Sequence, residues 1–510
     1  MTFSRRAVAA LALLAASAPF TTADEKSVNP KISKLIGEIS EDHIRATIAK
    51  LVSFGTRNTM SKADDPNHGV GAAREWILKE MQSYSPKLQV KFDKYRVKKQ
   101  GQRIFKDVDL WNVMAVLPGT KHPEAQVIVG GHYDSLNLGA RPAGQTAGPG
   151  GEAPPVNTTA NMTVEDFEKN AELPAPGACD DGSGTAAVME LARVMSQYEF
   201  DKTLVFVAFA GEEQGLIGSS LLSSRAKKEN QVIEAVLNND IIGTDVSGNG
   251  RVSNNAVEIY SDETMDSISQ QLSRYVREIS QRYIPSMRID TIFMADRLGR
   301  GGDHTPFQWE GFAAVRVSTP NEIYANQHHA TDTLENMSVP YTAKVAKVNA
   351  AVAAALALAP RPPIVLRAPG AGRGPNATAN ATAPQTDAGR GGRGGANATG
   401  AAAGGARGGR VPTPMISRGQ SGYDALLLWR PNGSDADIKG YSIVMRPTTS
   451  PYWEQEIYVG KVTQYLLKDV SIDDVKFGVK AIGNDGSESL VTPYAYPPRQ
   501  KTEIQTVEQP

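Results

Sequence analysis

The spacing of apolar residues along the chain changes at about residue 86. Between Ile32 and Ser85 apolar residues recur with the period of a helix, as in His43–Val52 and Ala72–Met81. Further on, helical stretches such as Gly184–Tyr198 separate short apolar runs, which cover Val108–Leu117, Gln126–Gly130, Lys202–Phe209 and Ile233–Asn238. Strands that alternate with helices predict an α/β domain whose sheet has helices on both faces.

A second change of pattern lies near Pro360. Residues 361–414 are rich in Gly, Ala, Asn and Arg and have too few apolar residues to offset the entropy of ordering, which predicts a disordered linker. Residues 415–500 alternate apolar and polar positions at the period of a strand and predict a small all-β sandwich. The strand-like segments are Leu426–Trp429, Ile438–Val444, Tyr465–Val470 and Phe477–Ile482.

The first residues have the pattern of a signal peptide. Arg5 and Arg6 precede the apolar run Ala7–Ala18, which is too short to anchor the chain in a membrane. Small residues near Ala18 and Ala23 suit a signal peptidase, so we expect residues 1–23 to be removed. This predicts a periplasmic or extracellular protein with no transmembrane segment in the mature chain.

Charge and cysteine content exclude some classes of protein. Lys and Arg number 54 against 55 Asp and Glu, a balance that gives no attraction for nucleic acid or an anionic membrane. The Arg-Gly-Gly units of the linker also occur in RNA-binding tails, but few aromatic residues accompany them. Cys179 is the single cysteine, so no internal disulfide forms, and we expect it to be a small buried residue rather than a nucleophile.

Two segments with metal-binding side chains follow the early strands. Gly130–Ser135 contains His132, and the carboxylate of Asp134 could hold the far nitrogen of its ring. Gly177–Gly184 contains two adjacent acids before a helix. Such acids cap a helix N-terminus or, as Asp180 could, bridge two cations.

Three further segments add acids and a histidine. A strongly apolar run ends in Glu212 and Glu213, of which one can bind a metal while the other takes a proton from water. Asp240 follows another apolar run, and His328 lies four residues before Asp332. Because the ends of strands meet at one edge of a sheet, these side chains are candidates for a single site.

The segments together resemble the co-catalytic zinc aminopeptidase family, which includes bacterial leucyl aminopeptidases, aminopeptidase Y and glutamate carboxypeptidases. Six motifs occur in the family's order over residues 40 to 355: His-x-Asp-Ser, Asp-Asp-x-Ser-Gly, Glu-Glu-x-Gly-Leu, Asn-x-Asp-x-Ile-Gly, Asp-His-x-Pro-Phe and His-x-x-x-Asp-Thr. The resemblance implies the zinc-exopeptidase fold, with a mixed, mostly parallel central sheet. It assigns residues 24–360 to the catalytic domain.

The resemblance also implies a role for each residue. Asp180 would bridge two Zn²⁺ ions, with His132 and Asp240 completing one site and Glu213 and His328 the other. His328 is preferred to His329 by its spacing from Asp332. Asp134 would orient His132, and Glu212 would be the general base. Nitrogen and oxygen ligands suit zinc, although manganese or cobalt could occupy the same set.

The implied function is an exported zinc aminopeptidase that acts on peptides with a free N-terminus. A carboxypeptidase of the same family and a glutaminyl cyclase-like transferase remain open alternatives. A serine hydrolase is disfavoured because no Gly-x-Ser-x-Gly motif occurs, and His-Glu-x-x-His is absent too. A tyrosine that some members have before Asp303 is replaced here at about Gly299, and Arg297 or Arg300 could take its place.

Two other parts of the chain complete the prediction. Trp429, Gly440 with Tyr441, and Phe477 are spaced as in a fibronectin type III domain, so the sandwich resembles that module. Such a module tethers an enzyme or binds a surface, carbohydrate or protein partner. The loop 138–176 could form a rim or lid over the site or be an unstructured insertion.

Overall fold

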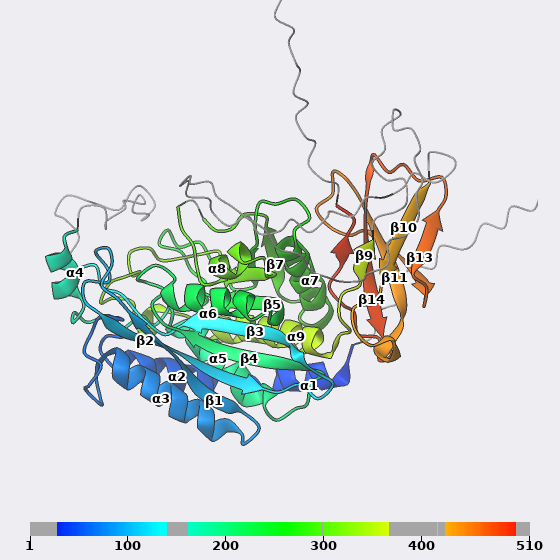
Figure 1. Cartoon of the computed structure of the whole chain (residues 1–510). Helices are drawn as coiled ribbons and strands as arrows, with labels where there is room; N and C mark the ends of the chain where they lie inside the picture. The colour runs from blue at the N-terminus through cyan, green and yellow to red at the C-terminus, as the bar shows by residue number, and fades with distance from the viewer. Residues whose placement is uncertain (1–27, 140–161, 298, 367–415, 417–423, 496–510) are drawn as a thin grey trace, which may run out of the picture.

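The computed structural model describes residues 28–139, 162–297, 299–366, 416 and 424–495 (Figure 1). The predicted signal peptide at residues 1–23 lies outside these residues, as does most of the predicted linker. None of the helices in the described ranges has both the length and the apolar character needed to cross a membrane.

Three helices precede the sheet, and the apolar spacing predicted the second and third of them. Polar caps begin the first two: Asn29 accepts a hydrogen bond from the backbone of Lys31, and Ser40 accepts one from the backbone of His43. These caps satisfy backbone N–H groups that have no partner within the helix. The helices are α1 (Pro30–Gly37), α2 (Glu41–Val52) and α3 (Gly69–Tyr84).

An eight-stranded sheet forms the centre of the larger domain, in the order β1-β2-β4-β3-β5-β8-β6-β7. The pairs β4–β3, β3–β5, β5–β8 and β6–β7 are parallel, whereas β1–β2, β2–β4 and β6–β8 are antiparallel. The predicted mixed sheet is therefore confirmed. Its strands are β1 (Gln89–Val97), β2 (Val108–Leu117), β3 (His122–His132), β4 (Lys202–Phe209), β5 (Val232–Asn239), β6 (Ala256–Tyr260), β7 (Arg288–Ile292) and β8 (Ala314–Ser318).

Helices cover both faces of this sheet (Figure 1). Alternate residues of each central strand enter different cores: Phe206 packs in the core with α5 and α9, and Val207 packs in the core with α6 and α8. Burial on both faces explains why these strands read as continuous apolar runs. The remaining helices of the domain are α4 (Val164–Asn170), α5 (Gly182–Met195), α6 (Ile217–Lys228), α7 (Ile268–Tyr283), α8 (His304–Trp309), η1 (Leu334–Asn336) and α9 (Val339–Leu358).

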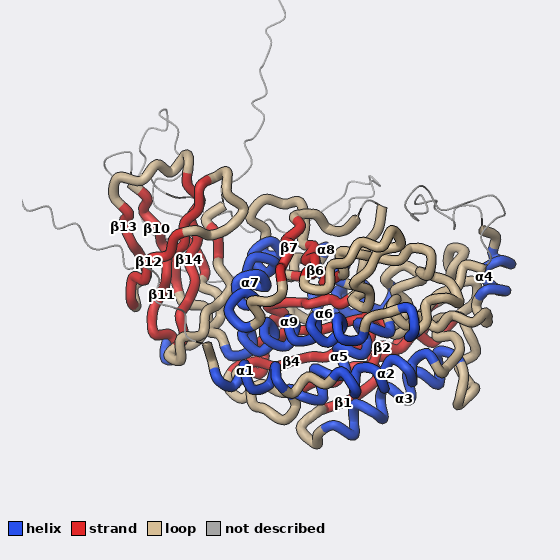
Figure 2. The backbone as a smooth tube through the Cα atoms, turned by 180° about the vertical axis from the view of Figure 1, so that it is seen from behind, coloured by secondary structure: helices blue, strands red, loops and turns tan. Residues whose placement is uncertain are grey.

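The C-terminal residues form an all-β unit of two antiparallel sheets, which lies beside α7 (Figure 2). One sheet has the order β13-β10-β9 and the other β12-β11-β14-β15. Trp429 and Tyr441 pack edge to face in its core, and the centroids of their rings lie 5.6 Å apart. Its elements are β9 (Ile364–Leu366), β10 (Ala425–Arg430), η2 (Asp435–Asp437), β11 (Ile438–Pro447), β12 (Gln455–Gly460), β13 (Gln464–Leu467), β14 (Val475–Gly483) and β15 (Thr492–Pro493).

One boundary differs from the sequence prediction. Residues 364–366 fall within the predicted linker, yet they form β9 and pair with Leu428–Arg430 of β10. A run of three apolar residues in a Pro-rich context carries too little periodicity to identify a strand, and the pairing partner lies some sixty positions further along the chain.

The sheet brings the candidate site together. β3, β4 and β5 are parallel neighbours, so His132, the Glu212–Glu213 loop and Asp240 all lie at their carboxyl-terminal ends. The loop before α5 and the loop before η1 reach the same edge and contribute Asp180 and His328.

Candidate metal centre

The two adjacent aspartates before α5 have different partners. Asp181 is the N-cap of α5, and its carboxylate accepts hydrogen bonds from the backbone N–H groups of Gly184, His132 and Ile241. This one side chain therefore links the start of the helix to the ends of β3 and β5. The capping role therefore belongs to Asp181, and the carboxylate of Asp180 faces the site instead.

Asp180 lies between two histidines. Its Oδ1 is 3.2 Å from Nε2 of His132, and its Oδ2 is 3.1 Å from Nε2 of His328. The amide of Gln327 also donates a hydrogen bond to Oδ2 at 3.0 Å. Each carboxylate oxygen thus faces a different imidazole, which is the arrangement that a bridging ligand needs.

One further acid joins each histidine. Asp240 Oδ1 lies 3.9 Å from Nε2 of His132, and Glu213 Oε2 lies 3.2 Å from Nε2 of His328. These contacts form two of the three groups, among the described residues, in which the possible ligand atoms lie within 4.8 Å of one another. The two are His132, Asp180 and Asp240, and Asp180, Glu213 and His328. These are the five residues that the sequence motifs suggested.

Asp134 holds the site through backbone atoms as well as its side chain. Its carboxylate accepts hydrogen bonds from the backbone N–H groups of Glu212 and Glu213, both at 3.3 Å, and from the hydroxyl of Thr59. The Nδ1 atom of His132 is 3.1 Å from the carbonyl oxygen of Asp134 and 3.7 Å from the carboxylate. The ring is therefore oriented mainly by the carbonyl, where the sequence suggested the carboxylate.

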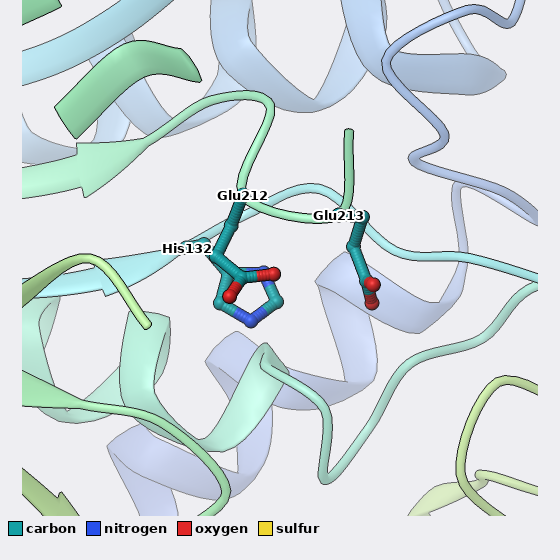
Figure 3. A group of neighbouring side chains, drawn as sticks. All are labelled: His132, Glu212 and Glu213. Atoms are coloured by element: carbon teal, nitrogen blue, oxygen red, sulfur yellow. The ribbon is translucent and has the colours of Figure 1, made fainter. Parts of the chain in front are cut away.

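Glu212 lies beside the His132 ring, and His132, Glu212 and Glu213 form a third group whose possible ligand atoms lie within 4.8 Å of one another (Figure 3). Glu213 therefore borders both His132 and, through its Oε2 atom, His328. Burial raises the pKa of Glu212 well above its ordinary value, and the charges of Asp240 and Glu213 raise it further, while His132 opposes them. A carboxyl group of raised pKa that borders the site can accept a proton from water and return it.

The side chains fit a cation. Glu213 is buried, and its Oε1 atom has no hydrogen-bond partner among the described residues, an arrangement that is costly unless something binds there. Burial alone would lower the pKa of His328, but Glu213 and Asp180 raise it to about 10. The centre therefore concentrates negative charge around nitrogen and oxygen donors, a set that suits zinc.

Cys179 and His329 stand apart from these groups. Burial raises the pKa of the Cys179 thiol well above its ordinary value, and the charges of Asp332 and Asp180 add to the effect, so a thiolate is disfavoured. His329 lines a separate surface pocket with Asn137 and Leu173.

The sequence offered no reason to single out two buried arginines around the centre. The guanidinium of Arg57 donates hydrogen bonds to the carbonyl oxygens of Tyr133, Pro176 and Gly177, which joins the loop after β3 to the loop before Asp180. Arg316 forms ion pairs with Asp240 and Asp296. Charged residues are normally exposed, so only their surroundings in the fold reveal these roles.

The arginines considered as substitutes for a tyrosine are engaged elsewhere. Arg297 forms ion pairs with Asp296 and Glu322, and Arg300 lies 3.4 Å from Glu322. A small pocket beside the centre extends from Asp180 to Glu322 and has Ile241 and Ile323 in its wall. The loop predicted at 138–176 is described only in part and contains α4.

Comparisons with known proteins identify the family of this chain. The sequence profile of peptidase family M28 matches residues 112–353, a range that includes all five candidate ligands. A probable zinc metalloprotease of Pyricularia oryzae is 33% identical over 90% of this chain and 83% of its own length, and one of Pyrenophora tritici-repentis is 30% identical over 91% and 98%. A solved structure, the LapA aminopeptidase of Legionella pneumophila, is 19% identical with a TM-score of 0.46, covering 65% of this chain and 76% of its own. The enzyme class predicted from the motifs, a metallopeptidase, is confirmed, and the chain belongs to peptidase family M28.

Proposed function

We propose that this chain is an exported two-zinc aminopeptidase. The observation that carries the proposal is the position of Asp180, whose two oxygens lie 3.2 and 3.1 Å from the imidazoles of His132 and His328. A carboxylate whose two oxygens each face a different imidazole can bind two metal ions at once, as the bridging ligand of a two-metal site does. The relatives named as zinc metalloproteases support zinc as the metal.

His132, Asp180 and Asp240 would hold one ion, and Asp180, Glu213 and His328 the other. Zinc bound there would supply Lewis acidity, which lowers the pKa of water and polarises the scissile carbonyl. Asp134 would keep Glu212 and Glu213 in place by accepting their backbone hydrogen bonds.

Glu212 would act as general base and then as general acid. It takes a proton from the attacking water as the water oxygen bonds to the carbonyl carbon, and it delivers that proton to the nitrogen as the C–N bond breaks. The products are the free first amino acid and a peptide shortened by one residue. The raised pKa of Glu212 suits a group that both accepts and donates a proton.

The charges around the centre favour an aminopeptidase over a carboxypeptidase. A carboxypeptidase needs a cation to bind the terminal carboxylate of its substrate. The nearby Arg297 and Arg316 are each paired with acids, and Arg316 is buried. Glu322, a carboxylate that is not assigned to zinc, instead lines the pocket beside Asp180 and would suit the ammonium group of a free N-terminus.

The domain organisation belongs to the same proposal. Residues 1–23 would be the export signal, residues 24–360 the catalytic domain, and residues 415–500 a fibronectin type III-like module joined by a linker. The two antiparallel sheets and the Trp429–Tyr441 contact support the module.

One peptide in three forms tests the specificity: free at both ends, N-acetylated, and C-amidated, each with zinc-loaded protein and with a chelated control. We expect acetylation alone to stop cleavage and residues to be released in order from the front. Loss of cleavage on amidation alone would reassign the chain to the carboxypeptidases. A peptide that begins with Gln and loses ammonia without hydrolysis would reassign it to the cyclases.

A further inference from the structure

Arg316 occupies an unusual position for a charged residue. It lies in the middle of β8, with 1% of its surface exposed, between Val315 and Val317. β8 is the parallel neighbour of β5, and the backbone of Asp240 donates a hydrogen bond to the carbonyl of Val317 at 3.1 Å. A buried guanidinium is costly unless its donors are satisfied. Both terminal nitrogens of Arg316 have partners, whereas its Nε has none among the described residues, so the terminal contacts indicate why the residue is there.

The two ends of the guanidinium bind different parts of the protein. Nη2 donates to Oδ1 of Asp240 at 3.0 Å and to the carbonyl oxygen of the same residue at 3.4 Å. Nη1 donates to Oδ2 of Asp296 at 2.7 Å and to the carbonyl oxygen of Gly301 at 3.1 Å. Arg316 therefore connects a candidate zinc ligand to the loop between β7 and α8.

A direct role in binding substrate does not fit these contacts. To reach a substrate, Arg316 would have to leave Asp240 and Asp296 as unpaired charges in a buried environment, which is strongly unfavourable. The hydroxyl of Ser318 adds a second hydrogen bond to the Asp240 carbonyl at 2.9 Å, so the backbone and side chain of Asp240 are both held.

We infer that Arg316 is a positioning residue for the zinc site that contains Asp240. Its planar guanidinium holds the Asp240 carboxylate in the group that includes His132 and Asp180, and Asp296 holds the guanidinium in turn. The inference rests on the proposed zinc function and adds to it a residue that binds no metal itself. Groups that hydrogen-bond a ligating side chain typically contribute about 10- to 100-fold to metal affinity.

Positioning and simple charge predict opposite results. A positive charge near a dication weakens its binding, so if charge were the only effect, Arg316→Met would bind zinc more tightly than the wild type. If the guanidinium positions Asp240, Arg316→Met binds zinc about 10- to 100-fold more weakly at one site. Arg316→Lys keeps the charge without the planar guanidinium, and it should also bind more weakly than the wild type.

The experiment is a zinc titration of the full-length, metal-free protein. Calorimetry in a chelator-buffered solution measures the zinc affinity at each binding step. Asp240→Asn identifies which binding step uses Asp240. Arg446→Met is the matched control, because Arg446 is also a buried arginine, and its Nη2 donates to Asp266 at 2.6 Å in the interface with the C-terminal unit. We expect the control to keep wild-type zinc affinity at both steps.

Weaker zinc binding in Arg316→Met and Arg316→Lys, confined to the step that Asp240→Asn identifies, supports the inference. Affinity equal to or above that of the wild type in Arg316→Met overturns it. Should Arg316→Met fail to fold, Asp296→Asn, which weakens the anchor of the Arg316 guanidinium together with the contact to Arg297, must show the same loss at the same step. A wild-type protein that binds one zinc, or none that depends on Asp240, contradicts the proposed function instead.

Discussion

The carboxylate of Asp332 accepts hydrogen bonds from the backbone N–H groups of Cys179 and Asp180, both at 2.9 Å. Asp332 belongs to the loop that carries His328, so the two loops that supply His328 and Asp180 are fastened to each other by one side chain. Burial raises the pKa of Asp332 to about 7, while the two backbone hydrogen bonds oppose that rise.

Asp332→Asn should therefore disturb both loops. An amide can accept only one of the two hydrogen bonds, and its NH₂ group would face the second N–H. We expect a loss of about 1–3 kcal/mol in the free energy of unfolding, together with weaker zinc binding. Urea denaturation and zinc titration measure the two effects. Unchanged zinc affinity would mean that the fastening is dispensable.

The adjacent glutamates should respond differently to the same substitution. Glu212→Gln should lower kcat by about 10²- to 10⁴-fold and leave zinc bound, because it removes only the proton acceptor. Glu213→Gln should lose zinc at the site that includes His328, since it removes a ligand. Metal analysis and kcat measured side by side distinguish them, and wild-type turnover in Glu212→Gln would contradict its role.

Zinc binding to the metal-free chain should release protons. Glu213 and Asp180 raise the pKa of His328 to about 10 against the effect of burial, so the imidazole is protonated at neutral pH in the absence of metal. A histidine must be neutral to bind zinc, so zinc affinity should rise with pH up to about 10. Calorimetry in buffers of different ionisation enthalpy detects the protons, and a heat that does not depend on the buffer would rule out their release.

A buried acid away from the centre should make stability depend on pH. Burial would raise the pKa of Glu190, but hydrogen bonds from Arg193, His43 and the backbone of Ser40 hold it below 4.5. A depressed pKa stabilises the fold above the unfolded value, and this contribution is lost as the pH falls below about 4.5. Glu190→Gln should thus be less stable than the wild type at pH 7, and the difference should shrink in acid. Urea unfolding at both pH values checks this; a constant difference would contradict it.

The sequence predicted the parts of this structure that depend on local pattern. Apolar runs located the central strands, and the acids or histidines after those runs supplied the candidates, from which the family resemblance selected His132, Glu213 and Asp240 as ligands. Asp180 and His328 came from motif spacing, because the loops that carry them have no periodicity.

Long-range contacts could not be predicted in this way. Arg57 and Arg316 look like ordinary surface charges until the fold surrounds them with carbonyl and carboxylate oxygens. Asp181 caps α5 and Asp180 faces the two histidines. The backbone geometry decides which of the two aspartates does which, and the sequence pattern does not contain that information. The pairing of β9 with β10 likewise depends on residues that meet only in the folded chain.

The most direct test of the central claim is the number of zinc ions per chain, measured by elemental analysis of the wild type and of Asp180→Ala after equilibration with equal free zinc. We predict two ions in the wild type and fewer in Asp180→Ala, because the bridging carboxylate serves both sites. A single ion in the wild type, or two ions retained in Asp180→Ala, would contradict the two-zinc centre.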